Sequence, residues 1–251
     1  MSNPFSLEGK VAVVTGANTG LGQGVAEALA KAGADVVAVG RTPPADTEAA
    51  VKAAGRRFHA ISADLGSIEP VERIVRETVE TLGGLDILVN NAGIIRRADA
   101  IDFTEADWDA VMDVNLKTAF FLSQAAARHM LKNGGGKIIN IASMLSFQGG
   151  IRVPSYTASK SGIAGLTKLL ANEWAAKGVN VNAIAPGYFE TNNTEALRKD
   201  ESRNRDILAR IPAGRWGDPS DLGGAAVFLA SRAADYVHGT ILPVDGGWLA
   251  R

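Results

Sequence analysis

Short apolar runs and amphipathic stretches alternate along the whole chain. Each apolar run of strand length is followed by a stretch in which apolar residues recur with helical spacing. The pattern predicts seven strands, at 11–14, 35–39, 58–62, 87–89, 137–141, 179–184 and 240–244. It predicts helices between them at 22–32, 47–54, 69–82, 108–132, 155–177 and 222–231, with Gly33 capping the first.

Strict alternation of strand and helix is typical of right-handed βαβ units, which build a parallel sheet covered by helices on both faces. We therefore expect an α/β Rossmann fold, a doubly wound seven-stranded sheet in a single dinucleotide-binding and catalytic domain over 1–251. The stretch 187–215 is predicted to be irregular, either disordered or a lid over the substrate. Ligands of such sheets bind beyond the carboxyl ends of the strands, where the motifs below fall.

Composition narrows the function classes. The 26 basic and 27 acidic residues leave no basic field to hold nucleic acid. The absence of cysteine excludes disulfides, thiolate metal sites and cysteine nucleophiles, and no metal is expected. No apolar run approaches the ~20 residues that span a bilayer, and the N-terminus lacks a signal-peptide pattern. We expect a cytoplasmic protein without nucleic-acid or membrane partners.

A glycine cluster joins the first strand to the first helix. Its sequence, TGANTGLG at 15–22, permits a tight turn and lets backbone N–H groups approach a pyrophosphate. The spacing is G-x-x-x-G-x-G, which differs from the commoner dinucleotide fingerprint and from a P-loop. The position after the first strand favours dinucleotide binding over a plain turn. The predicted contacts are Gly16, Asn18, Thr19, Gly20, Leu21 and Gly22.

The end of the second strand bears on the choice between NAD and NADP. The usual ribose-binding carboxylate is missing there, because the strand ends at Gly40-Arg41 and Asp35 lies at its other end. Gly40 leaves space, and Arg41 is placed to face a 2′-phosphate, which favours NADP over NAD. The alternative is a surface arginine without a ligand.

Tyr156 and Lys160 lie four residues apart at the start of a predicted helix, so they share one face. An unperturbed tyrosine has a pKa near 10, and a nearby ammonium together with a nicotinamide cation would favour the phenolate. Ser143 follows the strand at 137–141 and is placed to bond a substrate oxygen. A Tyr-x-x-x-Lys match alone is weak, whereas the whole constellation indicates an alcohol–ketone oxidoreductase.

From about 7 to 248 the chain resembles the short-chain dehydrogenase/reductase family. The resemblance rests on TGANTGLG, Asp64-Leu65, Asn90-Asn91-Ala92-Gly93, Asn115, Ser143, Tyr156, Lys160 and Pro186-Gly187. It implies a catalytic tetrad of Asn115, Ser143, Tyr156 and Lys160. It also implies cofactor contacts at Asp64, Leu65, Asn90, Asn91, Ala92, Gly93, Tyr156, Lys160, Pro186, Gly187 and Thr191. Family members are usually tetramers, so a homotetramer built on the helices at 108–132 and 155–177 is expected.

Within the family, the stretches at 90–97, 142–160, 185–194, 211–217 and 237–250 resemble sugar-acid enzymes of the 2-deoxy-D-gluconate 3-dehydrogenase and 2-keto-3-deoxygluconate oxidoreductase group. The resemblance implies a small sugar-acid substrate. An arginine fork suits its carboxylate, and Arg152 and Arg97 are the candidates, although either could be an idle surface residue. Gln148 is a candidate for a substrate hydroxyl, beside Ser143.

Other functions stay open at this point. Gluconate 5-dehydrogenases and 3-oxoacyl-carrier-protein reductases share much of the same sequence frame. A serine hydrolase is disfavoured, because no G-x-S-x-G elbow exists and the histidines lack motif context. A non-enzymatic nucleotide sensor on the same fold would be expected to lack the Tyr156–Lys160 pair.

Overall fold

The computed structural model describes residues 3–251. Seven strands form one sheet: β1 Val11–Thr15, β2 Asp35–Gly40, β3 Phe58–Ser62, β4 Ile87–Asn90, β5 Gly136–Ile141, β6 Val179–Pro186 and β7 Ile241–Val244. The α-helices are α1 Gly20–Lys31, α2 Ala45–Ala53, α3 Val71–Leu82, α4 Glu105–Met112, α5 Ala119–Met130, α6 Pro154–Trp174, α7 Glu195–Lys199, α8 Glu201–Arg210 and α9 Gly223–Ala230. In this range no helix is long and apolar enough to cross a membrane.

The strands pair in the order β3-β2-β1-β4-β5-β6-β7, and every pair is parallel. The chain adds strands outward from β1 to β3 and then crosses back to place β4 on the other side of β1. This reversal opens a crevice beyond the carboxyl ends of β1 and β4, where open α/β sheets bind their ligands. The doubly wound parallel sheet predicted from the sequence is confirmed.

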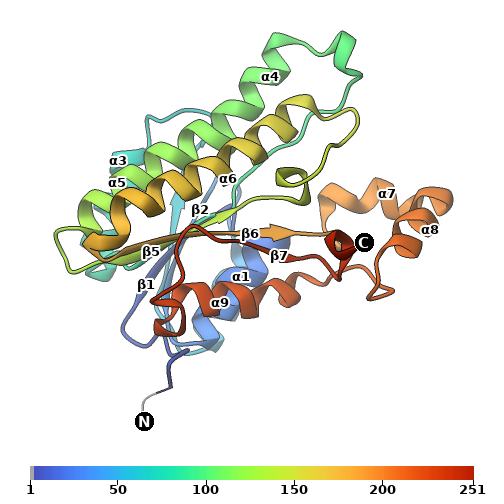
Figure 1. Ribbon diagram of the computed structural model, residues 1–251. Coiled ribbons are helices and arrows are strands. Elements are labelled where there is room, and N and C mark those ends of the chain that lie inside the picture. The colour runs from blue at the N-terminus through green and yellow to red at the C-terminus, as the bar shows by residue number, and fades with distance from the viewer. Residues whose placement is uncertain (1–2) are drawn as a thin grey trace.

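Helices cover the sheet on both faces (Figure 1). The face with α1 and α9 buries one apolar cluster, and the face with α3, α5 and α6 buries another. The central strands are buried along their length, as in β1 and β6, because both of their faces carry a helix layer. A smaller cluster lies where α8 meets the C-terminal segment (Figure 1), and it includes Ile207, Trp216 and Trp248.

The helix predicted at 108–132 begins earlier and is interrupted. Thr104 caps it by accepting a hydrogen bond from the Asp107 N–H at 3.1 Å, so α4 starts at Glu105. Between α4 and α5, Asp113–Thr118 forms a π-helical segment, a feature that often marks a functional site. The hydrophobic periodicity of the sequence does not reveal this segment, because a single π-helical turn shifts the apolar face of the helix only slightly.

The prediction of an irregular stretch at 187–215 is wrong. This stretch contains α7 and α8, and Asp200 caps α8 by accepting from the Arg203 N–H at 3.0 Å. Ile207 anchors α8 in the small apolar cluster, so the segment is packed on the C-terminal segment. The helices were missed because each is short and its apolar residues are sparse.

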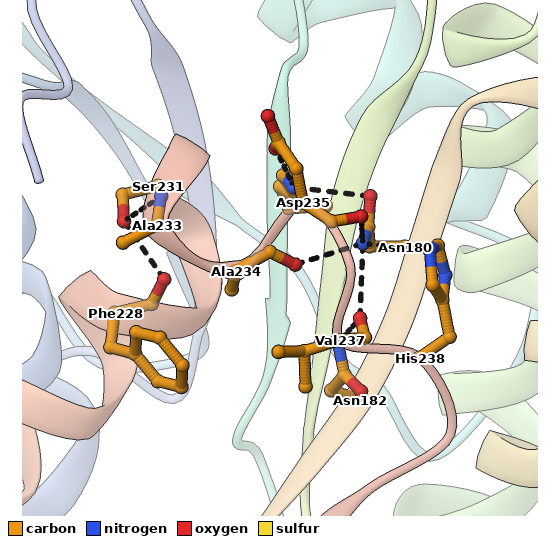
Figure 2. Close-up of polar contacts among 10 residues, drawn as sticks. Asn180, Asn182, Phe228, Ser231, Ala233, Ala234, Asp235, Val237 and His238 are labelled. Atoms are coloured by element: carbon orange, nitrogen blue, oxygen red, sulfur yellow. Dashed lines mark hydrogen bonds and ion pairs between the residues drawn. The ribbon is translucent and has the colours of Figure 1, made fainter. Parts of the chain in front are cut away.

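A polar cluster fastens the loop before β7 to β6 (Figure 2). The Asn180 side-chain N–H2 lies within 3.0–3.1 Å of the carbonyl oxygens of Ala234, Asp235 and Val237. Its carbonyl oxygen accepts from Lys137, 3.1 Å away, and Asn182 also donates to the Val237 carbonyl. The loop that leads into the last strand is therefore held by side chains of its neighbour strand.

Replacing Asn180 tests this attachment. Asn180→Ala removes the donor that the carbonyl oxygens of Ala234, Asp235 and Val237 share and the acceptor of Lys137, and we expect a loss of about 1–3 kcal/mol in the free energy of unfolding. Urea denaturation measures it. Thr81→Ala, at an exposed position of α3, is the matched control and should change stability by less than about 0.5 kcal/mol. Equal stability of the two variants would show that the cluster contributes nothing.

Candidate active site

The turn between β1 and α1 allows a ligand to approach the backbone closely. Gly16 and Gly20 adopt left-handed backbone angles, with φ of 64° and 58°, which favour glycine. Gly22 lies against the Gly16 carbonyl and the Asn91 amide, so a Cβ atom there would overlap both. Within the described chain, Thr19 makes no side-chain cap, and the first N–H groups of α1 stay available for an anion.

A cavity of about 700 Å³ extends from this turn along the carboxyl edge of the sheet. Most of the predicted cofactor residues line it: Gly16, Asn18, Thr19, Gly20, Leu21, Gly22, Gly40, Arg41, Asp64, Leu65, Asn91, Ala92, Gly93, Tyr156, Lys160 and Thr191. The glycine-lined wall and the open helix end suit a dinucleotide pyrophosphate. The residues present therefore fit the cofactor that the motifs imply.

The far end of the cavity carries no carboxylate at the end of β2. Gly40 has open space where a side chain would stand, and the neighbouring Arg41 is exposed and lines the cavity. Asp35 lies at the opposite end of β2, where Arg56 and Arg57 bind it at 2.8 and 2.7 Å. Hydrogen bonds and charges from these arginines outweigh burial and lower the pKa of Asp35. A second hollow, lined by 38–45 among others, adjoins Arg41.

Asn90 and Asn91 have different positions. Asn91 lines the cavity and donates to the carbonyl oxygens of Thr15 and Gly16 at 2.8 and 3.1 Å. Asn90 lies behind the wall, where it donates to Ser123 and to Asn140 at 2.8 and 2.9 Å. Asn90 is thus placed to support the cavity wall rather than to face its interior.

Asn115 lies in the π-helical segment and bridges two parts of the site. Its side-chain oxygen accepts from the Ile94 N–H at 2.8 Å, and its N–H2 donates to the Ile94 carbonyl and to the Ser159 hydroxyl at 3.0 and 3.2 Å. Ser159 immediately precedes Lys160. The segment after β4 is therefore held against the helix that carries Tyr156 and Lys160.

The structure brings Ser143, Tyr156 and Lys160 together at the carboxyl end of β5. Lys160 is 4% exposed, donates to the Ile141 carbonyl at 2.5 Å, and has its Nζ 5.6 Å from the centre of the Tyr156 ring. Ser143 starts a single helical turn, and its hydroxyl accepts from the Leu145 N–H at 3.2 Å. Pro154 at the start of α6 fixes where the tyrosine helix begins.

Burial and charge set the protonation of this pair. Burial raises the pKa of the Tyr156 phenol, while a hydrogen bond with Ser143 and the positive charge of Arg97 act in the opposite direction. Burial also lowers the pKa of Lys160 to about 8. Arg97 thus favours the phenolate, and Lys160, which the sequence predicts to do the same, has its Nζ 5.6 Å from the centre of the ring.

The predicted substrate residues are only partly gathered. Arg97 is close enough to act on the Tyr156 phenol, and its guanidinium donates to the Asn193 carbonyl at 3.5 Å. Arg152 is 62% exposed and binds Asp99 at 3.0 Å, so the structure gives its charge a partner outside the cavity. The side-chain oxygen of Gln148 accepts from Arg210 on α8 at 3.2 Å.

The turn after β6 contributes to one side of the cavity. Thr191 lines it, whereas Pro186 and Gly187 are not among the lining residues, and Gly187 packs closely on Asp245. Sequence reasoning missed Asn192 and Asn193, which extend the Thr191 side, and Arg96, which follows Gly93. The remaining lining residues are Thr42, Ala63, Gly66, Ile94, Ala110, Val114 and Ile141. In the sequence, these lining residues could be recognised only by their proximity to a predicted cofactor contact, because most of them are small or apolar.

A glycine turn at the switch point of a parallel sheet, with a tyrosine, lysine and serine gathered at the same carboxyl edge, defines a Rossmann-fold oxidoreductase. The family model described as Enoyl-(Acyl carrier protein) reductase matches residues 16–249. A 2-dehydro-3-deoxy-D-gluconate 5-dehydrogenase from Escherichia coli (strain K12) is 63% identical over 98% of each chain. The chain belongs to the short-chain dehydrogenase/reductase family.

Solved structures agree with this assignment. A crystal structure from Agrobacterium tumefaciens, provisionally named 2-deoxy-D-gluconate 3-dehydrogenase and holding NADP, is 64% identical over 100% of both chains, with a TM-score of 0.95. A gluconate 5-dehydrogenase from Burkholderia cenocepacia J2315 in complex with NADP and tartrate is 40% identical. That match covers 99% of this chain and 98% of the other, with a TM-score of 0.93.

Proposed function

We propose that this protein is a sugar-acid dehydrogenase that interconverts a secondary alcohol and a ketone with NADP(H). The observation that carries the proposal is the position of Arg97, which donates at 3.5 Å to the carbonyl of Asn193, a residue that lines the cavity together with Tyr156. Within residues 3–251 no carboxylate lies within ion-pair distance of Arg97. An unneutralised guanidinium beside a proton-carrying phenol suits a small substrate that bears a carboxylate.

The relatives support the same substrate class. Their names specify 2-dehydro-3-deoxy-D-gluconate, 2-deoxy-D-gluconate or gluconate as substrate, and the Burkholderia protein holds tartrate, another hydroxy acid. An acyl-carrier reductase is the alternative that the family model's description raises. The unpaired arginine beside the phenol favours the small acid over an uncharged acyl chain. We also propose that 1–251 acts as one domain, in the cytoplasm.

Each catalytic side chain has a role in the proposed mechanism. In oxidation, the Tyr156 oxygen takes the hydroxyl proton of the substrate, and the Ser143 hydroxyl donates a hydrogen bond to the same substrate oxygen. We propose that Lys160 binds the cofactor ribose and stabilises the phenolate, and that Asn115 keeps the lysine helix in position through its hydrogen bond to Ser159. When bound, the nicotinamide ring exchanges a hydride with the substrate carbon.

Cofactor contacts follow the lining of the cavity. The open N-terminus of α1 and its glycines would hold the pyrophosphate, Asp64 and Leu65 the adenine, and Arg41 the 2′-phosphate. Thr191 is proposed to contact the carboxamide. The proposed assembly is a homotetramer, which is supported by Trp108 on α4 and Leu169 on α6, large apolar side chains that are 40% and 46% exposed.

Tyr156→Phe tests the mechanism. The change removes the proton carrier and keeps the ring, so turnover of 2-dehydro-3-deoxy-D-gluconate with NADP(H), followed by NADPH absorbance, should fall at least about 10²–10⁴-fold. Thermal stability and NADP⁺ affinity should stay close to those of the parent protein. Half the parent turnover would contradict the mechanism. No turnover of any sugar acid by the parent would contradict the proposed function itself.

Arg41→Ala tests the choice of cofactor. A charge-assisted phosphate contact contributes about 1.5–3 kcal/mol, so NADP⁺ affinity should fall by about tenfold or more while NAD⁺ affinity hardly changes. Calorimetric titration of both cofactors measures this. Equal losses for the two cofactors would show that Arg41 has no phosphate role.

Arg97→Met tests the recognition of the carboxylate. Loss of the guanidinium should raise KM for the sugar acid about tenfold, a change of about 1.4 kcal/mol. Arg128→Met is the matched control, because Arg128 is an exposed arginine on α5 that already pairs with Glu72 at 3.1 Å, and its KM should change less than about threefold. A larger effect of Arg152→Met than of Arg97→Met would reverse this assignment.

A further inference from the structure

The arginines around the substrate end of the site fall into two groups. Four have a carboxylate partner within 3.5 Å, namely Arg96 with Asp107, Arg152 with Asp99, Arg198 with Glu190 and Arg215 with Asp221. Within residues 3–251, Arg97 and Arg210 have no carboxylate at ion-pair distance, and the same holds for Arg203 and Arg205 on α8.

Arg210 is instead joined to Gln148 and Trp248. The Gln148 side-chain oxygen accepts from Arg210 Nη2 at 3.2 Å and from Trp248 Nε1 at 3.3 Å. The guanidinium also lies over the Trp248 ring, 4.0 Å from its centre. We call these three side chains the Gln148 clasp.

The clasp is anchored to the frame of the active site. Trp248 is 5% exposed, packs 4.7 Å from the Tyr188 ring and shares a cluster with Met144. Met144 follows Ser143, and its carbonyl accepts from the Gln148 N–H at 3.1 Å. Tyr188 follows the end of β6. Gln148 is thus held beside the carboxyl ends of β5 and β6, on the segment that runs from Ser143 to Tyr156.

The partners of Gln148 settle which way its amide faces. The Arg210 guanidinium and the Trp248 indole N–H are donors only, so the atom that meets them has to be the carbonyl oxygen. The N–H2 group therefore points away from both. Within the described residues it has no hydrogen-bond partner, and the side chain is only half-buried. Gln148 offers two N–H donors and no acceptor to a ligand.

We infer that Gln148 is a specificity-determining residue that donates to the oxygens at the 2-oxo acid end of the substrate, with Arg210 and Trp248 as its positioning residues. The inference rests on the proposed sugar-acid function. A carboxylate and the ketone next to it can only accept hydrogen bonds, whereas a hydroxyl at the same carbon can also donate. A fixed donor therefore suits 2-dehydro-3-deoxy-D-gluconate at this position.

Gln148→Glu tests the inference, because a carboxylate still accepts from Arg210 and Trp248 but no longer donates. We expect KM for 2-dehydro-3-deoxy-D-gluconate to rise about tenfold more than KM for D-gluconate, whose C2 hydroxyl can donate to the new carboxylate. Repulsion between the carboxylates acts on both acids and cancels in this ratio. Where D-gluconate is not turned over, its competitive inhibition constant replaces KM. A ratio changed by less than threefold would overturn the inference.

Variants of the two neighbours test the positioning role. Arg210→Met and Trp248→Phe should each raise KM for the 2-oxo acid about threefold, with a smaller change in kcat, because the amide then turns more freely. In a Gln148→Met background neither should raise KM further. A further increase there would show that Arg210 binds the acid itself and would overturn its positioning role.

Two readouts separate this inference from the proposed function. If the parent protein oxidises or reduces no sugar acid with NADP(H), the proposed function fails and the inference fails with it. If the parent is active and the Gln148→Glu ratio is unchanged, only the inference fails. Melting temperature and NADP⁺ affinity of every variant show that the fold and the cofactor site are intact.

Discussion

The site depends on a small set of hydrogen bonds that join β1 to β4. The Thr15 hydroxyl donates to the Val89 carbonyl and accepts from the N–H groups of Asn91 and Ala92 at 3.0 and 2.9 Å. Asn91 in turn donates to the backbone of Thr15 and Gly16. The two strands on either side of the chain reversal are thereby fixed at their carboxyl ends. Gly22 can pack against the same turn only because it lacks a side chain, which brings the N-terminus of α1 to the cavity.

A second hydrogen-bond network links these strands to α6, the helix that carries Tyr156 and Lys160. Asn90 donates to Asn140, and Asn140 donates to Thr167 at 2.9 Å, so β4, β5 and α6 are joined through buried amides. Two turns before Thr167, Lys160 donates to the Ile141 carbonyl. The N–H2 groups of both asparagines are paired and each fixes the next side chain, whereas the Asn90 side-chain oxygen has no partner among residues 3–251. The tyrosine and lysine therefore occupy positions set by the sheet, although both lie on a helix.

The sequence was sufficient for the features that periodicity and glycine chemistry encode. Strand β3 matches its predicted range, and the glycine turn and the Tyr156–Lys160 pair lie where the motifs placed them. Features that depend on tertiary packing could not be predicted from the sequence. The π-helical segment around Asn115 leaves almost no periodic trace, and α7 and α8 gain their stability from packing on Trp216 and Trp248 rather than from local propensity.

Side-chain partners explain the remaining differences between the sequence-based predictions and the structure. Arg97 and Arg152 look equivalent in sequence, and only the structure shows that Asp99 neutralises one of them. Asn90 and Asn91 are adjacent, yet Asn90 is the last residue of β4 and points into the core, whereas Asn91 lies just beyond the strand and reaches the cavity. A strand reverses its side-chain direction at every residue, so a motif match cannot distinguish a supporting residue from a contacting one.

The backbone conformation of Arg152 indicates a structural role for this residue. It is the one non-glycine residue between 3 and 251 with a positive φ, 63°, an arrangement that needs support from its surroundings. Its ion pair with Asp99 supplies that support, together with the hydrogen bond from the Ala98 N–H to its carbonyl at 3.2 Å. These contacts join the segment that carries Arg97 to the segment that carries Gln148. The residue expected to bind the substrate carboxylate thus holds together the two segments from which we propose that the substrate is bound.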